Sequence, residues 1–223
     1  MNIQGAVFDM DGTLVESLTF WQFLWEHIGE RYFRDPSFRP SDSIDRSCRT
    51  MIYEDGMRLF TEHYPISEEF PIFMERAYQW IETYYHEYVL AKPGAAELLD
   101  ALKRHGVRMC LATATEPKYV RYLLKKLDFG KYFDFALSCS EVGAGKDKPD
   151  IYLEAAKQLA LPAENLAVFE DSYVALETAG RIGFHTIGIY DPNNYGHDRL
   201  KSASEIYMDR GETLSDLIGR IYR

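Results

Sequence analysis

IQGAVFDMDGT, residues 3–13, is the stretch that decides the fold of this chain. It opens with a short apolar run, residues 3–8, and turns abruptly polar at Asp9. A short apolar run that leads into a polar segment containing glycine is typical of a buried strand followed by a loop. We therefore expect a strand whose carboxyl end carries two carboxylates, those of Asp9 and Asp11.

The second half of the chain alternates strand-like and helix-like segments. The strand-like segments are residues 107–112, 133–137, 166–169 and 185–189, and the helix-like segments are residues 116–127, 149–159 and 172–182. This alternation predicts an α/β fold with a doubly wound parallel sheet. Ligands of such sheets bind outside the carboxyl ends of the strands, so the residues there are the candidates for a site.

Residues 17–90 have a different, aromatic-rich helical pattern, strongest around residues 20–25 and 68–89. Lys92, Pro93 and Gly94 interrupt it, and a further helical pattern then runs to Gly106, a helix stop. We expect an α/β core of residues 1–16 and 91–223 with a helical cap of residues 17–90 inserted into it. Most of the cap's aromatic residues are expected to form its own core rather than contact a substrate.

Composition excludes several classes of function. The 223 residues carry a formal net charge of -10, which disfavours nucleic acid as a partner. No apolar run is long enough to span a membrane, and the first twenty residues contain acids where a signal peptide has positive charge. We expect a cytoplasmic protein without a membrane or nucleic-acid partner, and free thiols at Cys48, Cys110 and Cys139.

Polar groups follow four of the expected strands. They are Asp9 with Asp11, Thr113, Lys146, and Glu170 with Asp171. Each has an ordinary structural explanation, such as a helix cap or a solvated loop charge. Together, however, the carboxylates would repel one another unless a cation or a proton compensated them. Since all the ligands are oxygens, we expect a Mg²⁺ site formed by Asp9, Asp11, Glu170 and Asp171.

This arrangement is typical of phosphoryl transfer. An ionised Asp9 beside Mg²⁺ could attack phosphorus, and Asp11 could serve as general acid and base. Lys146 and Thr113 would stabilise the charge on the phosphoryl oxygens. Gly12 would let the backbone approach those oxygens, although a turn glycine explains it equally well. The expected phosphate-binding residues are Gly12, Thr113, Ala114 and Lys146.

The same residues resemble the four motifs of the haloacid dehalogenase superfamily, in the same order and spacing. The subgroup that the chain resembles includes β-phosphoglucomutase and phosphoglycolate phosphatase and has a helical cap inserted after the first motif. Lys146 is preferred over Lys148 because it stands three places before the Pro149-Asp150 pair. Ala175 departs from the family, which often has a glycine there.

The resemblance also limits the reaction. Dehalogenating members lack the second aspartate, whereas Asp11 is present here. Members that cleave carbon–phosphorus bonds use a cap lysine, and residues 1–91 contain no lysine. Mutases use a cap histidine and lysine, and Trp21 stands where that histidine would align. We expect a magnesium-dependent phosphatase with an aspartyl-phosphate intermediate; the alternatives are a β-phosphoglucomutase-like mutase and a non-catalytic phosphate-binding module.

The cap should select the substrate, expected to be a small phosphate ester. Trp21 is the best candidate for an aromatic contact with the substrate, and Arg46 or Arg49 for a contact with a second anionic group. The alternative for the two arginines is pairing with Asp42 or Asp45 at the surface. We expect a monomer, and the sequence leaves a homodimer open.

Overall fold

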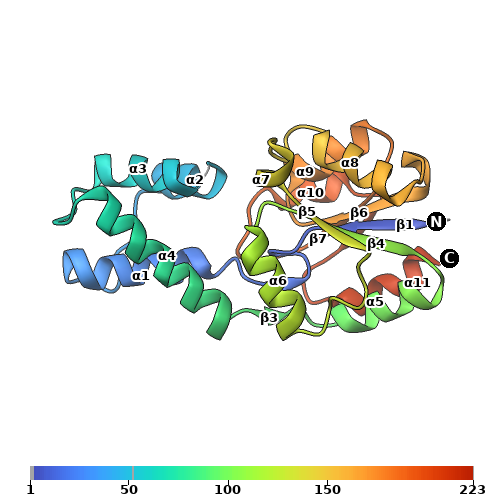
Figure 1. The fold of residues 1–223 in the computed structure, drawn as a ribbon, viewed down its shortest axis with the longest axis horizontal. Helices are drawn as coiled ribbons and strands as arrows, with labels where there is room; N and C mark the ends of the chain where they lie inside the picture. The colour runs from blue at the N-terminus through green and yellow to red at the C-terminus, as the bar shows by residue number, and fades with distance from the viewer. Residues whose placement is uncertain (1–2, 52, 223) are drawn as a thin grey trace. The chain divides into compact units, whose positions relative to one another are not determined.

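The computed structural model describes residues 3–51 and 53–222. The chain forms two compact units, one of residues 1–18 and 89–223 and the other of residues 19–88 (Figure 1). Their roles as catalytic core and substrate-selecting cap stay predictions. No helix in the described part of the chain has both the length and the apolar character needed to cross a membrane.

A six-stranded sheet forms the centre of the first unit. Its strands are β1 (Gly5–Phe8), β4 (Arg108–Thr113), β5 (Phe135–Ser138), β6 (Leu166–Glu170), β7 (His185–Ile189) and β8 (Ile206–Met208). The strand order is β5-β4-β1-β6-β7-β8, and every pairing is parallel. Phe8 at the end of β1 lies opposite Leu111 of β4 and Phe169 of β6. The predicted doubly wound α/β fold is confirmed.

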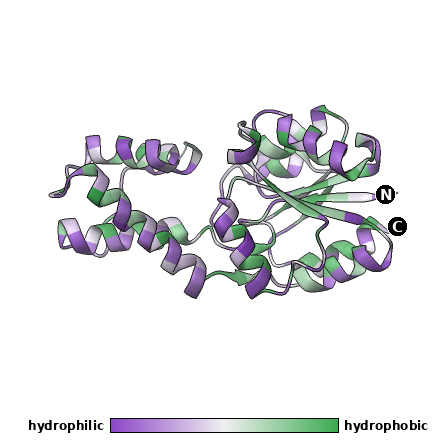
Figure 2. Ribbon diagram, in the orientation of Figure 1, coloured by the Kyte–Doolittle hydropathy of each residue, from purple (hydrophilic) through white to green (hydrophobic). Residues whose placement is uncertain are grey.

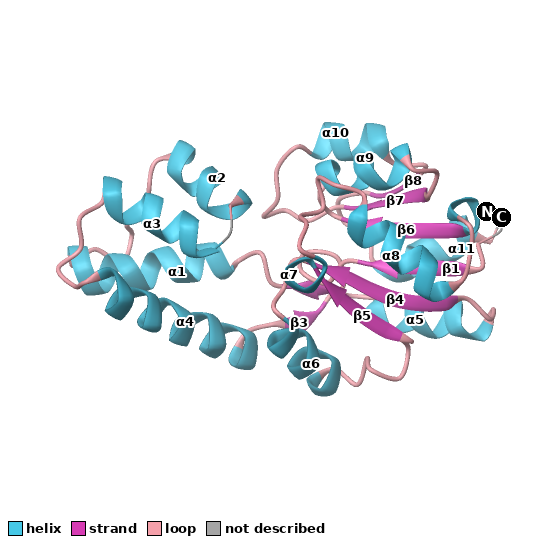
Figure 3. Cartoon of the chain, turned by 45° about the horizontal axis from the view of Figure 1, so that its top comes forward, coloured by secondary structure: helices cyan, strands magenta, loops and turns pink. Residues whose placement is uncertain are grey.

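Helices cover both faces of this sheet, with α8 and α9 on one face and α5 and α11 on the other (Figures 1 and 3). The helices of the unit are α5 (Ala95–Arg104), α6 (Pro117–Lys126), α7 (Cys139–Val142), α8 (Asp150–Leu159), α9 (Tyr173–Arg181), α10 (His197–Ala203) and α11 (Ile218–Ile221), with 3-10 turns at Ala163–Asn165 and Leu214–Leu217. Two short strands, β2 (Val15–Glu16) and β3 (Leu90–Ala91), pair antiparallel. In the chain, β2 comes just before residues 19–88 and β3 just after them.

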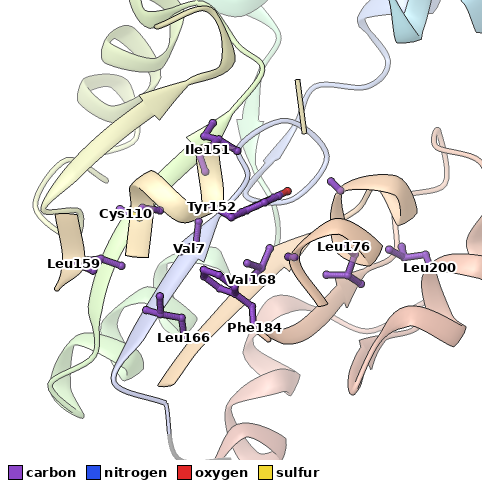
Figure 4. Close-up of a cluster of buried hydrophobic side chains, with 14 residues drawn as sticks. Val7, Cys110, Ile151, Tyr152, Leu159, Leu166, Val168, Leu176, Phe184 and Leu200 are labelled. Atoms are coloured by element: carbon purple, nitrogen blue, oxygen red, sulfur yellow. The ribbon is translucent and has the colours of Figure 1, made fainter. Parts of the chain in front are cut away.

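The core between the sheet and α8 and α9 explains why the central strands are mostly apolar. Val7 of β1 and Val168 of β6 pack in one cluster with Tyr152 of α8 and Leu176 of α9 (Figure 4). Cys110 belongs to the same cluster, as expected for a small buried residue. Because both faces are covered, the central strands are mostly apolar, and Figure 2 draws much of their length in green.

The second unit is helical. It contains α1 (Phe20–Ile28), a π-helical turn at Gly29–Phe33, α2 (Asp42–Thr50), α3 (Tyr53–His63) and α4 (Phe70–Glu87). Its centre is aromatic: the Trp25 ring stacks on Phe60 at a centroid distance of 5.1 Å, and Phe60 stacks on Phe73 at 6.3 Å. Phe20, Trp25 and Tyr84 are buried, whereas Trp21 is half-buried.

Candidate active site

The end of β1 and a tight turn position the first aspartates. The Asp9 backbone N–H donates to the carbonyl of Phe169, which continues the pairing with β6 by one residue. The turn then closes through hydrogen bonds to the Met10 carbonyl. Gly12 in this turn has a φ of +77°, and a Cβ there would lie 2.3 Å from Asp171 Oδ2. Both the backbone conformation and the space therefore require glycine.

Three carboxylates meet at the carboxyl ends of β1 and β6. Each of Asp9, Glu170 and Asp171 has an oxygen that lies within 4.8 Å of the other two, and all three residues are buried. The sheet order causes this, because β1 and β6 are neighbours although they are far apart in the sequence. Thr13 and Asp171, which follow these two strands, are 158 residues apart and are joined by a hydrogen bond. In doubly wound sheets, the point where the strand order reverses is the usual ligand site.

Lys146 is the cation of this cluster. Its Nζ lies 2.5 Å from Asp9 Oδ1 and 2.5 Å from Glu170 Oε1, and its side chain is 12% exposed. Lys148, the alternative from the sequence, is exposed, and its backbone N–H donates to the Gly145 carbonyl. The structure thus brings Lys146 to the carboxylates.

Burial and mutual repulsion disfavour the charged forms of two of the carboxylates. The pKa of Glu170 is raised to about 7, chiefly by burial; the Lys146 charge opposes the shift and the Asp9 charge adds to it. Burial, together with the charges of Glu170 and Asp9, raises the pKa of Asp171 well above its ordinary value. Burial alone would lower the pKa of Lys146, but Asp9 and Glu170 raise it well above the usual lysine range.

These properties fit a divalent cation. Three ionised carboxylates beside one ammonium would carry excess negative charge, and the raised pKa values of Glu170 and Asp171 follow from this repulsion and from burial. The donors are oxygens only, which suits Mg²⁺ better than zinc or copper. The ion's identity, and the predicted role of Asp11 as a fourth ligand, stay predictions.

Asp11 and Thr113 are joined by Thr115, which the sequence analysis did not single out. The Thr115 hydroxyl donates to the Asp11 carboxylate. The cluster of three carboxylates consists of Asp9, Glu170 and Asp171 and does not include Asp11. The Thr113 hydroxyl donates to Thr115 Oγ1 at 3.0 Å and accepts from the Thr115 backbone N–H at 3.1 Å. Ala114, between them, is exposed. The sequence could have pointed to Thr115, because it places a second hydroxyl two residues after Thr113.

Two further residues that the sequence analysis missed bind Asp171. Thr13 Oγ1 donates to Asp171 Oδ1 at 3.1 Å, and Asn194 Nδ2 donates to Asp171 Oδ2 at 2.6 Å. Thr13 stands within the motif that decides the fold, but it had no assigned role. Asn194 lies in the loop after β7, which is another strand end at the same edge of the sheet. Ligands bind at the carboxyl ends of the strands in such sheets, so the loop after β7 could have been selected from the sequence in the same way as the other four strand ends.

The predicted substrate-binding residues of residues 19–88 lie on α1 and α2. Arg49 Nε is 2.7 Å from Asp45 Oδ2, the pairing that was the alternative interpretation of this arginine. Its guanidinium also lies over the Trp21 ring, 5.6 Å from the centroid. Trp25 Nε1 donates to the other Asp45 oxygen, so Asp45 holds Arg49 beside Trp21. Arg46 is exposed.

Comparisons with known proteins agree with this geometry. Residues 3–183 match the model of a hydrolase family described as haloacid dehalogenase-like hydrolase. The chain is similar to the phosphorylated carbohydrates phosphatase of Thermotoga maritima, with 26% identity, 96% of this chain covered and 98% of the relative. It is also similar to the phosphoglycolate phosphatase of Salmonella choleraesuis, with 24% identity, 98% of this chain covered and 93% of the relative.

Among solved structures, the fold is similar to that of a putative β-phosphoglucomutase from Thermotoga maritima, with a TM-score of 0.81, 24% identity and 99% of each chain covered. The family match and the relatives named phosphatases confirm the predicted superfamily and the predicted class of enzyme. The chain belongs to the haloacid dehalogenase-like hydrolase family, as a hydrolase of phosphoric monoesters.

Proposed function

We propose that this protein is a magnesium-dependent phosphatase that hydrolyses a small phosphate monoester through an aspartyl-phosphate on Asp9. One observation carries the proposal: the Asp9 carboxylate lies against Lys146 and shares a buried cluster with Glu170 and Asp171. An ionised carboxylate in this cluster could act as a nucleophile, and the ammonium of Lys146 with a bound cation would neutralise a phosphoryl group.

Asp9 would act first. Its carboxylate oxygen attacks phosphorus, and the bond from phosphorus to the ester oxygen breaks. Lys146, already 2.5 Å from Asp9, would neutralise the phosphoryl oxygens, as would the hydroxyl of Thr113. A Mg²⁺ ion held by Asp9, Glu170 and Asp171 would supply further positive charge to the same oxygens.

Asp11 would control the protons. It gives a proton to the leaving ester oxygen, which departs as an alcohol, and then takes a proton from the water that attacks the aspartyl-phosphate. That attack releases inorganic phosphate and restores Asp9. The hydroxyl of Thr115 holds the Asp11 carboxylate, so it orients the acid for both steps.

The names of the relatives and two residues of α1 and α2 support a small phosphorylated substrate. Both relatives are named for phosphorylated small molecules, a carbohydrate class in one and phosphoglycolate in the other. Arg49 beside Trp21 offers one cation next to one aromatic face, which suits a small substrate with a second anionic or polar group. Cytoplasmic location and a monomeric state complete the proposal.

Phosphate release tests the proposal. Wild type, Asp9→Asn and the control Asp198→Asn, an exposed aspartate of α10, are assayed on a panel of sugar phosphates and phosphoglycolate. Each is run with Mg²⁺ and with chelator. We expect release by wild type and the control only with Mg²⁺, and none by Asp9→Asn. Full activity of Asp9→Asn would exclude Asp9 as the nucleophile. Isomerisation of glucose 1-phosphate without phosphate release would instead establish the mutase.

A further inference from the structure

Both oxygens of the Asp171 side chain are held by neutral donors from distant parts of the chain. Thr13 donates to Oδ1 at 3.1 Å. The Asn194 amide donates to Oδ2 at 2.6 Å and to the Asp171 backbone carbonyl at 3.1 Å. The two donors therefore determine the rotation of a carboxylate that belongs to the acidic cluster.

The loop that carries Asn194 is itself tied down at Asp191. Asp191 Oδ1 accepts from the backbone N–H of Asn193 at 2.8 Å, and the Asp191 carbonyl accepts from the backbone N–H of Asn194 at 3.1 Å. His197 Nε2 lies 2.9 Å from the same carbonyl. These bonds form a compact turn that points the Asn194 amide at Asp171.

A buried ion pair links this turn to another part of the first unit. Lys92 Nζ lies 2.6 Å from Asp191 Oδ2, and the two side chains are only 7% and 3% exposed. Lys92 follows strand β3, and its backbone N–H donates to the Leu14 carbonyl, next to the turn that carries Asp11. The segments that present Asp11 and Asn194 are thus joined through Lys92.

We propose that Asn194 is a positioning residue for Asp171, held in place by the Lys92–Asp191 ion pair, and that it sets the affinity of the acidic cluster for a divalent cation. The inference rests on the proposed function, since it assumes that Asp171 is a metal ligand. Partners that orient a ligand typically change metal affinity by about ten- to a hundredfold when removed. A carboxylate that has lost its donor can rotate away from the ion, so the ion must reorder it on binding.

A merely structural role for Asn194 makes a different prediction. If its amide only connected the loop to the backbone of Asp171, its loss would lower the thermal stability and leave the cation affinity unchanged. Metal affinity, measured directly, therefore separates the two roles. The neighbouring Asn193 is a matched control, because in the described part of the chain its side-chain amide bonds to Asp191, at 3.3 Å, and not to Asp171.

The experiment measures Mn²⁺ binding by electron paramagnetic resonance on the full chain of wild type, Asn194→Ala and Asn193→Ala. Mn²⁺ accepts the same oxygen ligands as Mg²⁺. We expect about ten- to a hundredfold weaker binding for Asn194→Ala and a change below about twofold for Asn193→Ala. Asn194→Leu, which keeps the size of the side chain without its donor, serves if the alanine variant does not fold.

The outcomes separate the two proposals. Wild-type affinity in a folded Asn194→Ala or Asn194→Leu would overturn the positioning role and leave the proposed phosphatase intact. Equal losses in the Asn194 and Asn193 variants would also overturn it, because the effect would then belong to the loop as a whole. Absence of Mn²⁺ binding by wild type would overturn the proposed metal function, and the inference with it.

Discussion

Replacement of Lys92 by methionine tests the buried ion pair that supports the Asn194 loop. Methionine is similar to the lysine side chain in length but has no charge, so Lys92→Met leaves the Asp191 carboxylate buried opposite an apolar group. In the wild type the two groups are 2.6 Å apart and almost fully buried. Removing one partner of such a pair strongly destabilises a protein, because the remaining charge is desolvated without compensation.

The expected loss is about 3–5 kcal/mol in the free energy of unfolding. For a chain of this length each kcal/mol lowers the melting temperature by about 2–4 °C, so the melting temperature should fall by about 6–20 °C. Thermal unfolding followed by circular dichroism measures this. Lys157→Met is the matched control: its partner Glu154 is 3.0 Å away, but the lysine side chain is 76% exposed. A change below about 1 kcal/mol is expected there.

A double variant gives the sharper test. Lys92→Met with Asp191→Asn removes both charges and keeps an oxygen at residue 191 for the bond from Asn193. It should recover a large part of the lost stability, since the penalty comes from an unpaired buried charge. If Lys92→Met melts within about 2 °C of wild type, the pair contributes little and the reasoning about this loop is refuted.

Three further changes test the site. Gly12→Ala should reduce both the melting temperature and kcat, because its Cβ would lie 2.3 Å from Asp171 Oδ2 in a left-handed turn; wild-type values of both would contradict this geometry. Divalent-ion affinity should weaken as pH falls below about 7, since burial raises the pKa of Glu170 to about 7 and the ion must displace a proton. Titration calorimetry at pH 6 and pH 8 measures this effect, and equal affinity would count against it. Thr115→Val should lower kcat while KM stays close to that of wild type, because it removes the hydroxyl that donates to the Asp11 carboxylate; an unchanged kcat would remove Thr115 from the site.

Local patterns allowed much of the fold to be predicted. The apolar run before Asp9 forms β1, and the predicted strand at residues 185–189 forms β7 with the same bounds. Such runs are informative because strands covered on both faces are apolar throughout. β8 was not predicted: it has three residues, of which only Met208 is buried, so its pattern is too short and too polar. The aromatic-rich segment was predicted to be helical, but the bounds of α2 and α3 within it were not predicted.

The sequence by itself determined which strand ends carry carboxylates, a lysine and a threonine, because hydrophobic runs and the groups that follow them are local properties of the chain. Only the tertiary structure decided which donors complete the site. Asn194 reaches Asp171 across 23 residues, Thr115 reaches Asp11 across 104, and Lys92 reaches Asp191 across 99. Each of these contacts depends on the parallel order of the strands and on the course of the loops between them, which no local pattern encodes. A neutral amide or hydroxyl in a loop gives no periodic signal, so its role appears only when folding places it against a buried charge.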